Sequence, residues 1–173
     1  MREHQPMCTS NKTTCNGFTI IEFIVLFVVI AVLTTIAMVN LPDIRHYRQT
    51  SAVDRVISDL TCCRNIAQSR VRHVRVTFNP GTDSYTVEVA NDSGGWTALQ
   101  DPLTQNAWNV NISTLFPGTG LQSVNVNGGT VLIFSSTNGI PCDGNLVPIS
   151  SDAIITFDSG HTVHVVPDTG YVY

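Results

Sequence analysis

The carboxylate with the most unusual surroundings is that of Glu22, which lies inside a long apolar run. From Phe18 to Leu41 the chain has 24 residues, and Glu22 is the only charged one. A carboxylate inside a membrane helix costs on the order of 3 kcal/mol on insertion scales, so it needs a partner. If the chain is cut after Gly17, the new amino group of Phe18 is the nearest cation, in the same chain or in a neighbour. The chemistry expected here is ion pairing in apolar surroundings.

Two tripeptides have the composition of an aspartic protease site, Asp158-Ser159-Gly160 and Asp168-Thr169-Gly170. That chemistry needs two carboxylates about 3 Å apart that share a proton. Each tripeptide instead lies where a tight turn is needed, with Asp supplying a local hydrogen bond and Gly a positive φ. His161 and His164 are three apart, so on a strand they face opposite sides and cannot chelate one metal. We therefore predict no catalytic residue, no metal site, no cofactor and no enzymatic activity.

The cysteines leave two alternatives open. Cys63 falls on an apolar helical stripe and is expected to be a buried thiol. Cys62 points about 100° away around the same helix, a direction from which it could reach Cys142 in a later loop. The alternatives are a Cys62–Cys142 disulfide and three free thiols.

The apolar run 18–41 is expected to be a transmembrane helix. At about 1.5 Å per residue it is long enough for a bilayer core, which needs about 20 apolar residues. Lipid offers the backbone no hydrogen bonds, so the run should be helical despite its β-branched residues. Pro42 follows the run. Because proline lacks an N–H donor and clashes with the preceding turn, a kink or break is expected there.

Residues 42–74 are expected to form an amphipathic stem helix that continues from the apolar run. Apolar residues recur there at three- and four-residue steps, which is the spacing of one helical face: Val53, Val56, Ile57, Leu60, Cys63, Ala67 and Val71. Polar residues lie largely off that stripe: Arg48, Arg55, Asp59, Arg64, Gln68 and Arg72. The arginines are expected either to be solvated or to pair with acidic surfaces of neighbouring subunits.

Residues 75–173 are expected to form a β-rich globular domain. After Arg75 the apolar period changes to two, and Asn79-Pro80-Gly81-Thr82-Asp83 is typical of a hairpin turn. Expected strands cover 74–78, 85–89, 96–99, 109–115, 121–126, 131–135, 153–157, 162–166 and 171–173. The fold class predicted is α+β, a long N-terminal helix packed on an antiparallel β-sandwich or sheet.

The stretch Gly17-Phe18-Thr19-Ile20-Ile21-Glu22 resembles the prepilin peptidase site of type IV pilins and type II secretion pseudopilins. The resemblance implies that residues 1–17 are a leader, that the peptidase cuts between Gly17 and Phe18, and that Phe18 is N-methylated. Glu22 would then neutralise the amine of an adjacent subunit. The order of stem helix and strands is similar to the GspH/FimT group of minor pseudopilins and minor pilins, which implies a pilin-like fold.

That resemblance implies a filament subunit of a type II secretion pseudopilus or type IV pilus. Its partners would be other pilins or pseudopilins in a hetero-oligomeric filament, the prepilin peptidase and the inner membrane. The protein would cross the bacterial inner membrane once, with its C-terminal domain in the periplasm.

The rival function is DNA capture during natural transformation. The net charge of the whole chain is −4. Beyond Arg75 there are eight acidic residues and no Lys or Arg. FimT-like proteins implicated in DNA uptake tend to end in a basic Gly-Arg-x-Arg stretch, whereas this chain has Gly170-Tyr171-Val172-Tyr173 there. Because phosphate contacts supply most nucleic-acid affinity, the composition argues against this function.

Overall fold

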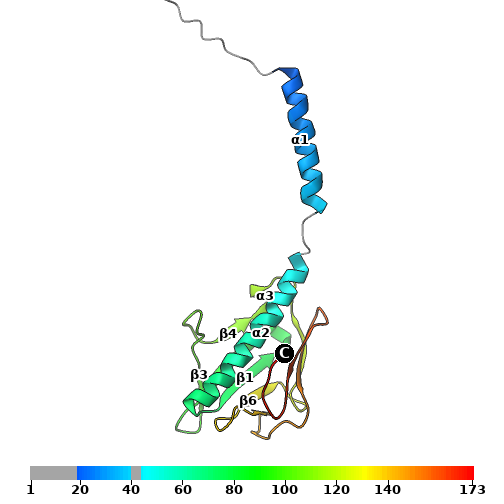
Figure 1. The fold of residues 1–173 in the computed structure, drawn as a ribbon. Helices are drawn as coiled ribbons and strands as arrows, with labels where there is room; N and C mark the ends of the chain where they lie inside the picture. The colour runs from blue at the N-terminus through cyan, green and yellow to red at the C-terminus, as the bar shows by residue number, and fades with distance from the viewer. Residues whose placement is uncertain (1–18, 40–43) are drawn as a thin grey trace, which may run out of the picture. The chain divides into compact units, whose positions relative to one another are not determined.

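A computed structural model describes residues 19–39 and 44–173 in two units, divided after Pro42. The first unit contains helix α1 (Ile20–Val39), drawn in blue in Figure 1. Among the described residues, no helix meets the length and apolarity that a membrane span requires. The predicted span 18–41 extends beyond the described residues at both ends, and Gly17, Phe18 and the break expected at Pro42 lie outside them.

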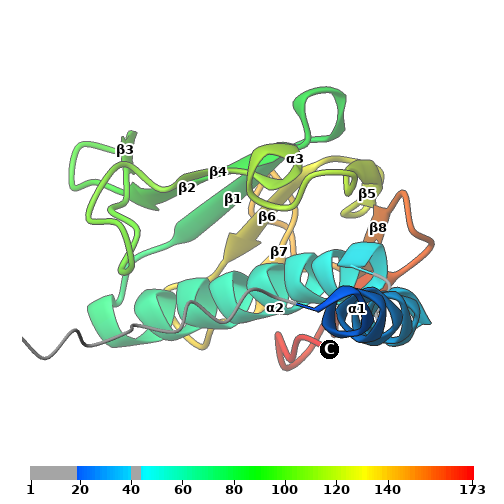
Figure 2. The ribbon, with the colours of Figure 1, turned by 90° about the horizontal axis from the view of Figure 1, so that it is seen from above.

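Helix α2 (Ile44–Arg70) opens the second unit and lies along its sheets (Figure 2). It contacts strands from both sheets of the unit, β1, β6 and β9. Four members of the predicted stripe are buried, Val56, Leu60, Cys63 and Ala67, together with Ala52 and Asp59. The predicted Val53 and Ile57 are half-buried. The prediction was wrong for Asp59, which is buried, and for Val71, which is 70% exposed.

The larger sheet has the strand order β3-β2-β1-β6-β7, with β4 paired to β2. Its strands are β1 (Val74–Asn79), β2 (Ser84–Ala90), β3 (Trp96–Ala98), β4 (Asn109–Asn111), β6 (Val131–Phe134) and β7 (Pro141–Cys142). The pairs are antiparallel, and β1 pairs with β2 from Val74↔Val89 to Asn79↔Ser84. The predicted hairpin is confirmed, with a 3₁₀ turn (Pro80–Thr82) joining its strands.

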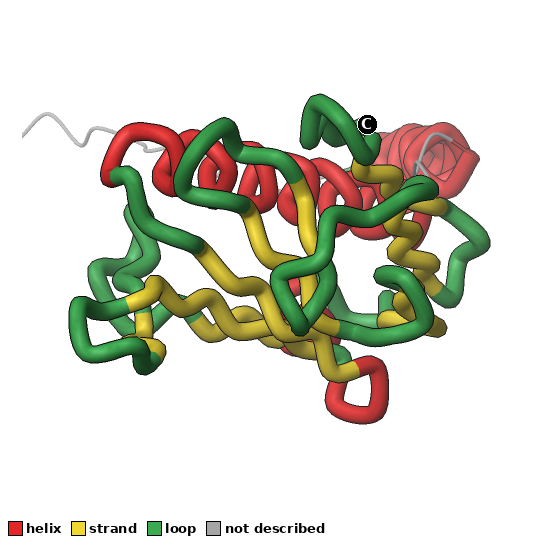
Figure 3. The backbone as a smooth tube through the Cα atoms, turned by 90° about the horizontal axis from the view of Figure 1, so that it is seen from below, coloured by secondary structure: helices red, strands yellow, loops and turns green. Residues whose placement is uncertain are grey.

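The smaller sheet has the order β5-β8-β9, also antiparallel. Its strands are β5 (Leu121–Asn125), β8 (Ala153–Phe157) and β9 (Thr162–Val165). Figure 3 shows the strands of both sheets alongside helix α2 and the loops that join them. Buried side chains of α2 and of both sheets form one hydrophobic cluster. The predicted α+β fold class is confirmed.

Three strand predictions differ from the structure. The strand expected at 109–115 turns after Asn111 into helix α3 (Ile112–Leu115), because the Asn111 carboxamide oxygen accepts the Thr114 N–H at 2.8 Å and caps the helix. Strand β7 was expected to be loop. The strand expected at 171–173 is a single bridge between Val165 and Val172, held by the paired main chains of His164 and Tyr173.

Val71 ends α2 in a conformation that suits glycine. Its φ is +51°, and the N–H of Arg72 donates to the Ala67 carbonyl at 3.3 Å, the pattern of a Schellman motif. A β-branched residue is disfavoured in the left-handed region. We expect Val71→Gly to raise the free energy of unfolding by about 1 kcal/mol, since little packing is lost at this exposed position. Urea unfolding of the full chain in detergent measures it.

Ser69→Gly, two residues earlier in the same helix, is the matched control. There the backbone is helical, so glycine should lower stability by about 1 kcal/mol. If both substitutions destabilise to the same degree, the left-handed strain assigned to Val71 is wrong.

Candidate functional site

Glu22 lies in the first turn of α1 and is bonded to the residue that caps the helix. Its Oε2 accepts the Thr19 N–H at 2.8 Å and the Thr19 hydroxyl at 3.0 Å. The Glu22 N–H points back to the Thr19 Oγ1 at 3.4 Å. This reciprocal arrangement is a capping box, which satisfies otherwise unpaired donors at a helix start. The Thr-x-x-Glu spacing is the sequence signal for this capping box.

The rest of α1 presents apolar side chains to its surroundings. Glu22 borders a shallow hollow with Ile21, Val25, Leu26 and Val29, and every described side chain from Ile20 to Thr35 is exposed. Glu22 is the only charged residue among Ile20–Val39. The helix therefore offers an apolar face with one carboxylate at its N-terminal end.

The most buried ionic group of the second unit is a network that the sequence analysis missed. Arg55 Nε lies 2.9 Å from Asp59 Oδ2, and Arg55 Nη2 lies 3.0 Å from Asp101 Oδ2. The same Asp59 oxygen accepts the Tyr85 hydroxyl at 2.5 Å and the Trp108 indole N–H at 3.3 Å. Asp59 and Asp101 are only 6% and 5% exposed. The network ties α2 to β2 and to the loop that precedes β4.

A sequence signal for this network did exist. Asp59 is three residues after Val56 and four before Cys63, which places it on the buried stripe that we assigned to apolar side chains. A carboxylate on a buried helical face needs donors, and Arg55, one turn earlier, is the first candidate. Tyr85, Asp101 and Trp108 are distant in sequence, so only the fold brings them to this network.

Burial raises the pKa of the Tyr85 phenol above its ordinary value, and the nearby Asp59 carboxylate adds to the effect. The unfolded phenol ionises near pH 10, so above that pH the folded chain retains a proton that the unfolded chain has lost. Stability should therefore fall as pH rises above about 10, by up to about 1.4 kcal/mol per pH unit from this residue. Tyr85→Phe should remove that part of the slope. Urea unfolding from pH 8 to 11 measures the stability of the wild-type chain and of Tyr85→Phe. An equal loss of stability in the two would disprove the role given to the Tyr85 phenol.

Two of the remaining arginines of the second unit form ion pairs within the chain, and a third bonds to a main-chain carbonyl. Arg72 contacts Asp92 at 2.6 Å, and Arg75 contacts Glu88 at 2.6 Å. Arg48 donates to the Pro117 carbonyl at 3.4 Å. The guanidinium of Arg75 also lies 4.3 Å from the centre of the Trp96 ring. Pairing of stem arginines with neighbouring subunits stays a prediction.

The protease-like tripeptides occupy turns, as predicted. Gly160 and Gly170 both have a positive φ, +82° and +62°. A Cβ on Gly170 would lie 2.7 Å from the Gly139 carbonyl oxygen, so glycine is required there by space as well as by conformation. The two histidines are half-buried and separate: His161 contacts the Ser159 hydroxyl at 2.9 Å, and His164 lies 3.4 Å from Asp152. Among the described residues no cluster of potential metal ligands forms.

Cys62, Cys63 and Cys142 are free thiols in the structure. Cys63 is fully buried, as predicted. The structure does not join Cys62 to Cys142. Burial raises the pKa of the Cys62 thiol, and the nearby carboxylates of Asp59 and Asp101 raise it further. Asp101 follows β3 at one edge of the larger sheet, whereas Cys142 lies in β7 at the opposite edge.

The fold is that of an α+β protein in which one long helix packs on antiparallel sheets. No protein-family model matches the chain, and no curated protein matches it. The chain is similar to two solved structures of the minor pseudopilin EpsH from the type II secretion system of Vibrio cholerae. One has a TM-score of 0.46 at 12% identity and covers 69% of this chain and 97% of that chain. The other has a TM-score of 0.40 at 11% identity and covers 70% and 98%.

Proposed function

We propose that the chain is a minor pilin-like subunit that assembles through its N-terminal helix into a type II secretion pseudopilus or a type IV pilus. The observation that carries the proposal is Glu22, the single carboxylate on an otherwise apolar α1, five residues after Gly17. A carboxylate kept in such surroundings is costly unless a cation meets it. The amine that a cut after Gly17 would create on Phe18 is such a cation.

In this mechanism the segment 18–41 anchors the subunit in the inner membrane before assembly and packs among the same helices of other subunits afterwards. Glu22 meets the Phe18 amine of a neighbour and sets the axial register of each new subunit. An unpaired charge among apolar helices is strongly unfavourable, so only the correct register is tolerated. The partners are therefore other pilins or pseudopilins, with the prepilin peptidase acting first.

The second unit would face the periplasm and make the contacts that distinguish this subunit from others. Its helix α2 is fixed to the sheets by the apolar stripe and by polar bonds that leave the helix. Asp59 accepts the Tyr85 hydroxyl and the Trp108 indole N–H, and Arg55 pairs with Asp101. The stem helix and the β domain would therefore act as one rigid body in those contacts. No observation on the described residues favours the DNA-binding rival, since three of the seven arginines after the leader are held in ion pairs within the chain.

Processing at Gly17 tests the proposal directly. In cells with an active prepilin peptidase, we expect the mature protein to begin at Phe18 and to carry one methyl group on its amine. Gly17→Ala should leave the precursor uncut, because a side chain at that position occupies space that the peptidase needs. Intact-mass spectrometry of the purified membrane protein measures both.

Asn16→Ala is the matched control, since it changes the adjacent residue and should be processed normally. A wild-type protein that still begins at Met1 in such cells would remove the basis of the proposal.

A further inference from the structure

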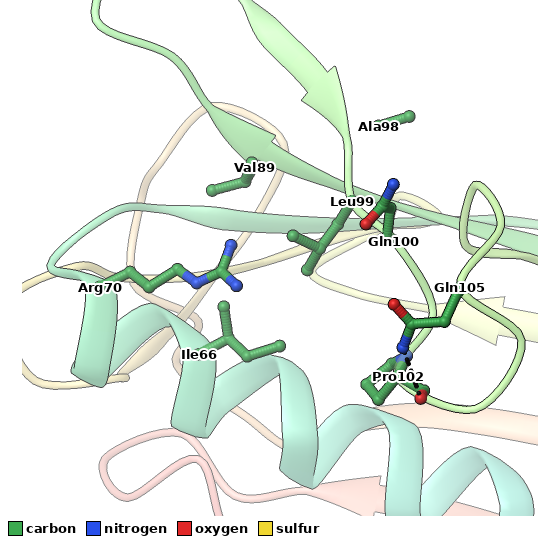
Figure 4. Close-up of a pocket in the computed structure, with 8 residues that line it drawn as sticks. All are labelled: Ile66, Arg70, Val89, Ala98, Leu99, Gln100, Pro102 and Gln105. Atoms are coloured by element: carbon green, nitrogen blue, oxygen red, sulfur yellow. Dashed lines mark hydrogen bonds between the residues drawn. The ribbon is translucent and has the colours of Figure 1, made fainter.

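A cavity of about 410 Å³ lies between the C-terminal end of α2 and the strands β2 and β3 (Figure 4). Its apolar lining comes from Ile66, Val89, Leu99 and neighbouring Ala98 and Pro102. Its polar lining is Arg70, Gln100 and Gln105. The volume is within the range of ligand sites, and polar and apolar groups share the lining surface about equally.

The guanidinium of Arg70 points into this cavity in Figure 4, above Ile66 and towards Leu99. No acidic residue lines the cavity. Within residues 19–39 and 44–173, none of the ion pairs found involves Arg70. The cavity therefore presents a cation with several N–H donors next to an apolar wall. A carboxylate is the group that best matches a guanidinium, in charge and in its two-oxygen geometry.

The opposite wall of the cavity is fixed by the buried network. Asp101, held by Arg55 at 3.0 Å, accepts the Leu103 N–H at 2.8 Å through Oδ1. The Asp101 carbonyl accepts the Gln105 N–H at 2.9 Å, and the Gln105 side chain donates to the Pro102 carbonyl at 3.0 Å. These bonds hold Pro102 and Gln105 at the rim of the cavity. The site is thus formed in advance, which lowers the entropic cost of binding.

Gln105 is held there with a φ of +59°. Glutamine rarely adopts the left-handed region, and such strain persists only where the surroundings impose it. Val71, next to Arg70, is also left-handed, but its conformation is accounted for by the Schellman motif that ends α2. Strained residues of this kind gather at binding sites.

We propose that this cavity binds a peptide segment of a partner protein in which an Asp or Glu carboxylate adjoins a large apolar side chain. The carboxylate pairs with Arg70, and the apolar side chain packs on Ile66, Val89 and Leu99. A peptide is favoured over a free small acid because the carboxamides of Gln100 and Gln105 flank the cavity and can bond to a peptide main chain.

The inference does not depend on the filament function. The cavity includes no residue of α1, so Glu22 substitutions that stop assembly should leave peptide binding unchanged. Failure of the two proposals can therefore be told apart.

The test uses the full chain in detergent and two probes, N-acetyl-Leu-Asp-amide and the isosteric N-acetyl-Leu-Asn-amide. Nuclear magnetic resonance titration of the Val89 and Leu99 methyl groups and the Arg70 Nε–H measures binding. We expect the Asp peptide to bind at least tenfold more tightly than the Asn peptide, because only the former makes a charge-assisted pair. Arg70→Gln should reduce that ratio to about one.

Arg48→Gln is the matched control, an arginine of the same helix that lies far from the cavity in sequence and bonds to Pro117. It should leave the tenfold ratio intact. Equal affinity for the two peptides, no shift of the Val89 and Leu99 methyls, or an unchanged ratio in Arg70→Gln would each overturn the proposal. A similar loss of preference in Arg48→Gln would show a general charge effect and would overturn it too.

Discussion

Replacing Glu22 with glutamine is expected to abolish co-assembly with partner pilins while leaving membrane insertion and cleavage intact. Glutamine has nearly the same shape as glutamate and can occupy the same place in a capping box with Thr19. It lacks the charge that would neutralise the Phe18 amine of a neighbour. An unpaired ammonium among apolar helices costs several kcal/mol, which is enough to prevent addition of a subunit. Fractionation measures insertion, and crosslinking to the major subunit measures assembly.

The capping box makes a decisive control available. Thr19→Ala removes the hydroxyl that bonds to Glu22 and keeps the charge, so it should weaken the helix start by about 1 kcal/mol and still assemble. Glu22→Leu removes both the cap and the charge, and should fail as glutamine does. If glutamine assembles normally and Thr19→Ala does not, Glu22 serves only to start the helix.

The sequence predicted the elements whose residues follow a single period. The stripe of α2 and the alternation of β1 and β2 depend on local spacing, so their bounds were within a few residues of those observed. Where the observed elements differ from this spacing, a helix cap or a helix end is the cause. At Asn111 a side-chain cap overrides an apolar strand pattern, and at Val71 the helix ends one residue before the last member of the stripe.

The network around Asp59 shows why sites are harder to predict than elements. A single helix pattern marks Asp59 as facing the core, but its three donors come from sequence positions 55, 85 and 108. Only the pairing of β1, β2 and the loop after β3 brings Tyr85 and Trp108 to the same oxygen. The cavity beside Arg70 depends on the same loop, so it too could not be read from spacing. By contrast, Glu22 can be singled out from the sequence because its apolar surroundings are consecutive residues.

The largest loss of stability in the second unit is expected from Asp59→Ala. The substitution leaves Arg55 with only Asp101, and it removes the acceptor of the Tyr85 hydroxyl and the Trp108 indole inside the core. Removing one partner of a buried ion pair typically costs 3–5 kcal/mol, about the size of the whole stability of a marginal domain. We expect a fall of about 4 kcal/mol in the free energy of unfolding, measured by urea unfolding of the full chain in detergent.

Asp54→Ala is the matched control, because Asp54 is an exposed carboxylate of the same helix and should change stability by less than about 0.5 kcal/mol. A double-mutant cycle of Asp59→Ala and Tyr85→Phe tests whether the two side chains stabilise the fold through their shared hydrogen bond. Tyr85→Phe should destabilise the wild-type chain but have a smaller effect once Asp59 is alanine, because the hydroxyl then has already lost its acceptor. Additive effects of the two substitutions would mean that Tyr85 and Asp59 act separately. In that case the polar contribution to the position of α2 on the sheets would have to come from Trp108 and from the Arg55–Asp101 pair.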